Sequence, residues 1–168
     1  VECLDGSGLD VDNGVVVNAS CECRVPGVFA AGDVARHDHP LFGPVRIEHY
    51  NNAEKQGRHV ARAILEKAGP YDYMHSFWSD QYDHNIEYVG YADKWDEFVF
   101  REGDGLLGFY LAGGKIKAAV GLDRGGDPEA EPDSELAACA DLIRKQAEID
   151  PSLLADNDAA LPSLLPPG

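Results

Sequence analysis

The sequence predicts an α/β segment followed by a small α+β domain with an antiparallel sheet. Three observations predict this fold. An apolar run ends in Gly-Asp, a long amphipathic helix follows it, and short strand-like runs separated by glycine-rich turns come next. The 168 residues suffice for one ordinary domain or two small ones. A boundary near Gly69-Pro70 divides the chain into residues 1–68, a second domain at 69–150 and a flexible tail at 151–168.

The first segment begins with glycine-punctuated turns and then alternates short apolar runs with loops. Its expected order is a strand at 15–18, a strand at 28–31, a loop at 36–44 and a helix at 50–67. The loop is expected because the stretch holds two prolines and two histidines. The helix carries small or apolar residues at helical spacing, and Gly69-Pro70 ends it.

The second region opens with an aromatic stretch at 71–83 that the sequence predicts to be irregular. Strands are expected at 86–91, 97–101, 106–111 and 115–120. The glycines at 103–105 and at 113–114 are hairpin turn signals. A helix at 134–147 follows, with Ser134 as its N-cap. The prolines after Asp150 predict an extended or disordered tail.

The charge and the cysteines narrow the functional classes. With 30 acidic and 14 basic residues the formal charge is -16, so neither nucleic acid nor an anionic membrane is an expected partner. No apolar run is long enough to span a membrane. The four cysteines lack a Cys-x-x-Cys spacing and are expected to be buried free thiols in a reducing, cytoplasmic compartment. The chain starts at Val1 rather than Met, which favours a fragment or a processed product.

The segment that says most about a possible ligand site is residues 25–35, with the sequence VPGVFAAGDVA. A carboxylate at the end of a strand is well placed to accept a hydrogen bond from a ligand hydroxyl at the sheet edge. Gly32 would let a ligand approach the backbone closely. Taken alone, the pattern more often belongs to a strand followed by a turn in which the acid, here Asp33, is merely solvated.

Two further segments have a functional and a structural interpretation. Residues 45–50 (VRIEHY) precede the long helix, and the N–H groups at a helix start form an anion site. Phe77-Trp78 can be a core or interface pair, or can cover the face of a ligand ring. His37, Asp38 and His39 alternate as metal ligands do, but no third ligand is placed, so a solvated loop and no metal are expected.

Together these three segments resemble the ferredoxin reductase and apoptosis-inducing-factor-like group of the FAD-dependent pyridine nucleotide-disulfide oxidoreductases. The resemblance implies that residues 1–68 are the C-terminal part of an FAD-binding domain and that 69–150 form the reductase C-terminal domain. Many members carry Thr where this chain has Cys23. The residues implied to bind FAD are Gly32, Asp33, His49 and Tyr50, and Glu48 and Trp78 are implied on the nicotinamide side.

The implied reaction passes electrons from NAD(P)H through FAD, one at a time, to an iron–sulfur protein such as a ferredoxin or a Rieske centre. No acid–base catalyst is identified in this chain. The letters of Gly-x-Gly-x-x-Gly occur only at 103–108, where a hairpin is expected, so the isolated chain is expected to be inactive. Three alternatives remain open. The chain could be a dimerisation or partner-docking module, in which case a homodimer is one expected assembly. It could also be a redox sensor of the apoptosis-inducing-factor type or a stand-alone acidic binding protein.

Overall fold

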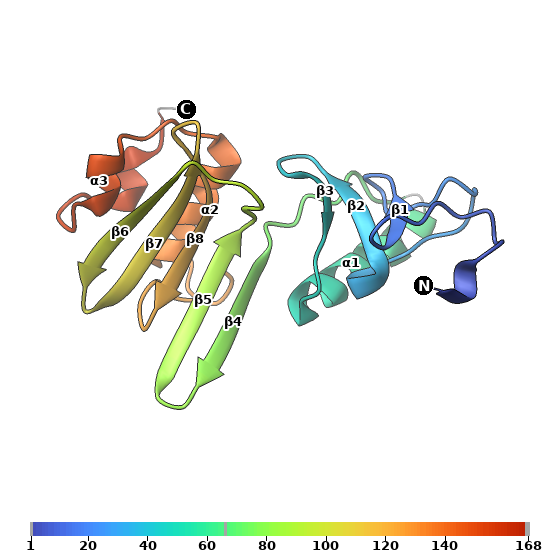
Figure 1. The fold of residues 1–168 in the computed structure, drawn as a ribbon, viewed down its shortest axis with the longest axis horizontal. Helices are drawn as coiled ribbons and strands as arrows, with labels where there is room; N and C mark the ends of the chain where they lie inside the picture. The colour runs from blue at the N-terminus through green and yellow to red at the C-terminus, as the bar shows by residue number, and fades with distance from the viewer. Residues whose placement is uncertain (1, 66, 167–168) are drawn as a thin grey trace. The chain divides into compact units, whose positions relative to one another are not determined.

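The computed structural model describes residues 2–65 and 67–166 of the chain. It divides into two compact units, Val1–Tyr73 and Met74–Gly168 (Figure 1). Each unit has its own sheet, so the two are described separately below.

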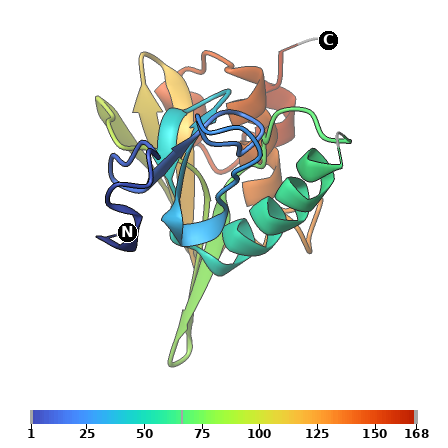
Figure 2. The same ribbon diagram turned by 90° about the vertical axis from the view of Figure 1, so that its right-hand side faces the viewer.

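The first unit is a small three-stranded sheet with one long helix. Its strands stand in the order β1-β2-β3, with β1 parallel to β2 and β2 antiparallel to β3. The elements are η1 (Glu2–Leu4), β1 (Val15–Val17), η2 (Gly32–Val34), β2 (Ala35–His39), β3 (Gly43–Arg46) and α1 (Tyr50–Ile64). In Figures 1 and 2 the helix α1 lies next to this sheet, where it packs on η2.

Apolar residues and a set of polar residues share the interior of the first unit. The apolar cluster joins β1 and β2 to the loop cysteines and to Tyr71, and Val60 of α1 packs against it. The polar residues that α1 contributes to the interior are Asn51, Asn52 and Gln56, all buried. The Tyr71 hydroxyl donates to the Asn52 side chain at 3.0 Å, so these two buried polar groups satisfy each other inside the unit.

The first unit differs from the sequence-based expectation in two places. Residues 36–44, expected as a loop, form the hairpin β2–β3, in which His37 pairs with Val45. Alternate residues of β2 point inward, so His37 and His39 are each only 1% exposed. Residues 28–31, expected as a strand, contribute only an isolated bridge between Phe29 and Glu22.

The second unit is a five-stranded antiparallel sheet with helices on one side. The strands stand in the order β4-β5-β8-β7-β6. They are β4 (Ser76–Gln81), β5 (His84–Gly90), β6 (Glu97–Gly103), β7 (Gly105–Ala112) and β8 (Lys115–Leu122), followed by α2 (Glu135–Lys145), α3 (Pro151–Ala155) and η3 (Leu161–Leu164). The expected glycine turns are confirmed: Gly103 pairs with Gly105, and Ala112 with Lys115.

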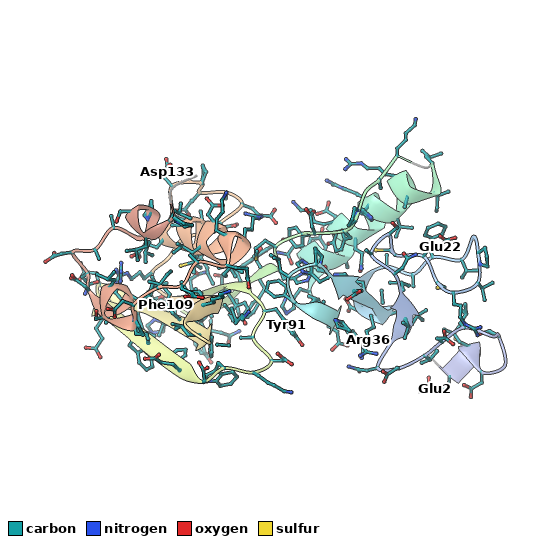
Figure 3. The ribbon with its side chains drawn as sticks, turned by 90° about the horizontal axis from the view of Figure 1, so that it is seen from above. Glu2, Glu22, Arg36, Tyr91, Phe109 and Asp133 are labelled. Atoms are coloured by element: carbon teal, nitrogen blue, oxygen red, sulfur yellow. The ribbon has the colours of Figure 1, made fainter. Side chains whose placement is uncertain are left out.

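The two faces of this sheet differ in composition. On the helix side, Leu107, Phe109 and Leu111 of β7 are fully buried, and α2 packs on β8 and β5 (Figure 3). On the other side an aromatic row crosses the strands. Tyr88 stacks on Phe77 with ring centroids 5.0 Å apart, and it lies 6.3 Å from Tyr110. The sheet therefore has a packed core on one face and a half-exposed aromatic row on the other.

The second unit also corrects two expectations. Residues 76–81, within the stretch expected to be irregular, form the edge strand β4. The tail at 151–168, expected to be flexible, contains α3 and η3, with Leu154 and Leu161 buried. Asp150 caps α3 through a 2.9 Å bond from the Ser152 N–H, and a proline follows the cap, which is the usual start of a helix.

Within residues 2–65 and 67–166, no helix combines the length and the apolar character that crossing a membrane requires.

Candidate functional site

The Gly32–Asp33 turn lies directly against α1. Gly32 has a φ of +74°, a conformation that glycine adopts without strain. Its N–H donates to the buried side chain of Gln56 at 2.8 Å, and a Cβ added at Gly32 would stand 3.2 Å from the Ala53 Cβ. Asp33 itself is exposed. The turn is thus anchored on its glycine while the aspartate faces outward.

The lead-in to α1 brings three more predicted residues to the same place. His49 occupies the N-cap position but makes no side-chain cap hydrogen bond, and the first turn of the helix holds no acidic residue. Burial lowers the pKa of His49, and the charges of Asp33 and Glu48 oppose that shift. Tyr50 is 78% exposed. The Asn51 side chain accepts from the N–H of Asn52 at 3.0 Å, but the N-cap side chain makes no cap hydrogen bond, and such a helix start suits an anionic ligand.

Arg46 links the turn to this lead-in. Its Nε donates to the Asp33 carbonyl oxygen at 2.7 Å, and one Nη donates to the Glu48 carboxylate at 2.6 Å. The other Nη donates to Asn13 at 3.2 Å. Three segments that are separate in sequence, around residues 13, 33 and 48, therefore meet at one guanidinium group.

Trp78 lies on the second unit, on the edge strand β4. Its indole is 52% exposed, and Trp78 pairs in register with Glu87 of β5. Both residues line a small pocket together with Pro128. Of the six predicted site residues, five thus come together in the first unit and Trp78 stands in the other.

Sequence reasoning missed Arg46 and Gln56. Both contact the backbone of the Gly32–Asp33 turn, from 13 and 24 residues away along the chain. Gln56 lies on the inward side of α1 and is 0% exposed. The sequence held one signal for Gln56: it is a polar residue on the helix face that was predicted to pack inward, among small residues.

His37 and His39 do not lie in a solvated loop, which corrects the expectation for this segment. Their rings are 5.7 Å apart, and the ring of Tyr71 stands 5.3 Å from that of His37. Burial, and then the charge of His39, lowers the pKa of His37 to about 4. Among the described residues no group of three His, Cys, Asp or Glu side chains is arranged to hold a metal ion.

The first unit should therefore lose stability on mild acidification. The unfolded chain protonates His37 near pH 6.5, whereas the folded chain resists protonation until about pH 4. Over that range the unfolded state binds more protons, so stability falls as pH falls, by up to about 3 kcal/mol for this one group. Hydrogen exchange of the β1 and β2 amides should accelerate between pH 7 and 5, after correction for the intrinsic rate. Amides of β7 and β8 serve as the control, because those strands contain no histidine.

A His37→Gln variant should show a shallower dependence of this protection on pH. An equal slope in the variant and the parent would assign the acid sensitivity to other groups.

The cysteines are free thiols, as expected, but they are not all buried. Cys21, Cys23 and Cys139 are buried, whereas Cys3 is exposed. Burial raises the pKa of Cys21 to about 11, and a hydrogen bond from Gln56 opposes that shift. A thiol with such a pKa is protonated at neutral pH and unreactive, so Cys21 is a packing residue.

A separate open pocket of about 440 Å³ lies in the first unit. Its lining includes Glu22 and Arg36, both labelled in Figure 3, together with Asp10, Arg24 and Asp38. None of the predicted site residues lines it. The pocket and the Gly32–Asp33 site are therefore distinct features of the same unit.

Comparison with protein families matches both regions of the chain. Residues 76–165 match the family described as "Reductase C-terminal". Residues 1–57 match "Pyridine nucleotide-disulphide oxidoreductase". The first match spans most of the second unit, and the second spans the Gly32–Asp33 turn and the first half of α1.

Similar curated proteins and solved structures point the same way. The chain is 37% identical to the ferredoxin--NAD(+) reductase component of an anthranilate 1,2-dioxygenase system from Burkholderia cepacia, covering 98% of this chain and 40% of that protein. It is 30% identical to putidaredoxin reductase from Pseudomonas putida, covering 98% and 38%. A structure of the covalent putidaredoxin reductase–putidaredoxin complex superposes with a TM-score of 0.82 at 31% identity, covering 97% of this chain and 38% of that one.

The chain thus spans about two fifths of the length of the relatives it matches. The same is true of a ferredoxin reductase structure from Rhodopseudomonas palustris, with a TM-score of 0.81, 27% identity, and coverage of 97% and 39%. Both family matches, the relatives and the fold agree on one assignment. The chain belongs to the pyridine nucleotide-disulphide oxidoreductase family and carries its reductase C-terminal region.

Proposed function

We propose that this chain is the C-terminal part of an FAD-dependent reductase that passes electrons from NAD(P)H to an iron–sulfur protein. The single observation that carries the proposal is the placement of Asp33, Glu48, His49 and Tyr50 around one turn and one helix start. The names of the relatives support the reaction, since they are ferredoxin--NAD(+) reductases of dioxygenase systems.

The residues present suit a flavin dinucleotide. The exposed Asp33 carboxylate can accept hydrogen bonds from the ribitol hydroxyls, and Gly32 keeps the turn free of a side chain. The N–H groups at the start of α1, beside His49 and Tyr50, favour negative charge on the ring. FAD, when bound, accepts a hydride and releases its electrons singly. The chain's own part is to anchor the cofactor through Asp33, to polarise it through the start of α1 and to cover a ring with Trp78.

The remaining assignments extend this proposal. Glu48 and Trp78 would face the nicotinamide. The electron acceptor would be an iron–sulfur protein, either a ferredoxin, as named for the anthranilate dioxygenase relative, or a Rieske centre. We place the protein in the cytoplasm because the buried thiols Cys21 and Cys139 are free, which suits a reducing compartment.

The purified 168-residue chain should be colourless. The only Gly-x-Gly-x-x-Gly match, at 103–108, is the β6–β7 hairpin and has no helix after it, so it does not form the pyrophosphate-binding turn. A flavin absorption spectrum near stoichiometric content would contradict this expectation. The full-length protein, purified in parallel, is the control and should be yellow.

A partner-docking or dimerisation role is a second candidate, favoured by the open face of the five-stranded sheet. Trp95 and Phe100 are each 52% exposed there, and Leu122 is 38% exposed. The Trp95 ring stands edge-on to Tyr110 at 5.1 Å, so the exposed groups continue the aromatic row. Exposed apolar patches of this kind mark interaction sites. The solution mass of the full-length protein, compared with its Phe100→Asp variant, tests for a homodimer through this face.

A further inference from the structure

Two side chains from different elements hold the backbone of the Gly32–Asp33 turn. Gln56 of α1 binds the N–H of Gly32, and Arg46 of β3 binds the carbonyl oxygen of Asp33. We propose that Gln56 and Arg46 are positioning residues that fix the direction of the Asp33 carboxylate for FAD. This inference rests on the proposed function, and the experiment below separates the two.

Gln56 is the inner support of the turn. Its side chain is 0% exposed, its Oε1 accepts from the Gly32 N–H at 2.8 Å, and its Nε2 donates to the Cys21 thiol at 3.5 Å. Both ends of the amide are therefore used, which leaves one orientation of the side chain. An apolar residue here would leave the Gly32 N–H buried without this acceptor, and Gly32, which has no Cβ to restrict its backbone, would let the turn shift.

Arg46 is the outer support. A guanidinium presents its donors in a fixed fork, and here Nε takes the Asp33 carbonyl while the two Nη groups take Glu48 and Asn13. A lysine cannot reproduce three directed bonds from one planar group. Because Glu48 immediately precedes His49, the N-cap of α1, the same guanidinium also fixes the position of the turn relative to the start of α1.

Both supports act on the backbone of the turn, so they leave the carboxylate oxygens of Asp33 available to a ligand. A carboxylate already held in its binding direction loses less conformational freedom when the ligand arrives. Removing either support should therefore raise the FAD dissociation constant by about three- to tenfold. The effect should exist only while Asp33 is present, because the supports act through that residue.

The experiment is a double-mutant cycle in the full-length protein that contains this chain. The variants are Gln56→Met, Arg46→Met, Arg46→Lys and Asp33→Ala, and the first three are each combined with the last. FAD is removed, and its dissociation constant is measured by the change in flavin fluorescence on rebinding. Arg58→Met is the matched control, since it removes an exposed arginine from α1 that pairs with Glu54. Thermal melting of each apoprotein reports any loss of fold.

The proposal expects Gln56→Met and Arg46→Met each to weaken binding about three- to tenfold, and Arg46→Lys to resemble Arg46→Met. None of the three should add a loss in the Asp33→Ala background, and Arg58→Met should bind FAD like the parent. Equal losses with and without Asp33 would overturn it and reduce both residues to structural roles. If Gln56→Met melts early, the cycle on the partly exposed Arg46 decides alone. If Asp33→Ala binds FAD as tightly as the parent, the proposed flavin site itself fails, and the inference with it.

Discussion

Replacing Asp33 by alanine in the full-length protein should weaken FAD binding by about one to two orders of magnitude. A carboxylate that accepts ligand hydroxyls in a cleft makes charge-assisted hydrogen bonds worth roughly 1.5–3 kcal/mol each. Asp33 is exposed on a turn whose backbone is already held by Gln56 and Arg46, so its loss removes ligand contacts rather than fold contacts. Flavin content per chain after dialysis, and the dissociation constant on rebinding, measure the effect.

Asp38→Ala is the matched control for this substitution. It removes the same charge from an exposed aspartate in the same unit, on β2 rather than at the turn. His37→Ala is unsuitable as a control, because His37 is buried in the interior of the first unit and its truncation would leave a cavity. Equal flavin content in the Asp33 and Asp38 variants would remove the main support for the flavin site.

The elements that the sequence predicted well are those whose signals are local. The strands β6, β7 and β8 follow from short strand-like runs and from the glycine turns at 103–105 and 113–114. The second helix follows from its amphipathic pattern and its N-cap, and Ser134 does accept from the Ala137 N–H at 3.2 Å. In each case the residues that determine the element lie within it or beside it.

The hairpin β2–β3 was missed because its determinants are distant. Two histidines and two prolines in a short stretch usually indicate a loop. Here His37 is buried against Tyr71, 34 residues further along, and His39 bonds the Tyr73 carbonyl oxygen at 3.1 Å. Tertiary partners of this kind outweigh local propensity. The tail was missed for a different reason, since Asp150-Pro151 is a local helix start that the count of prolines obscured.

The residues of the candidate site also separate into those with a local sequence signal and those without one. The resemblance supplied the predicted positions of Asp33, Glu48, His49 and Tyr50, which carry sequence motifs. The residues that join them, Arg46 and Gln56, act on backbone atoms, so no spacing between them and the turn distinguishes them in the sequence. Contacts to the main chain can be made by many side chains, and only coordinates show which one makes them.

The largest effect on stability is expected from Arg101 in the second unit. Its side chain is 2% exposed, and its guanidinium donates to the carbonyl oxygens of Leu154 at 2.7 Å, Leu153 at 3.0 Å and Ala159 at 3.2 Å. It also stands 5.8 Å over the Phe109 ring. One buried cation thus joins the last segment of the chain to the edge strand β6, and we expect it to hold residues 151–164 in their folded conformation.

Arg101→Met should therefore cost about 3–5 kcal/mol and release the segment that contains α3. Methionine fills much of the same volume, but the three carbonyl oxygens lose their shared donor in a buried place. Arg101 also forms an ion pair with Glu135 at 3.7 Å, but Glu135 keeps two shorter bonds to Arg124, at 2.7 and 2.8 Å, so most of the loss falls on the final segment. Arg144→Met is the control. That arginine is half-exposed, and its ion pair with Asp141 across one helical turn is worth about 0.5 kcal/mol. Urea unfolding gives the cost, and hydrogen exchange of residues 153–161 locates it. A cost for Arg101→Met no larger than that of the control would show that the apolar contacts of Leu154 and Leu161 hold this segment without the arginine.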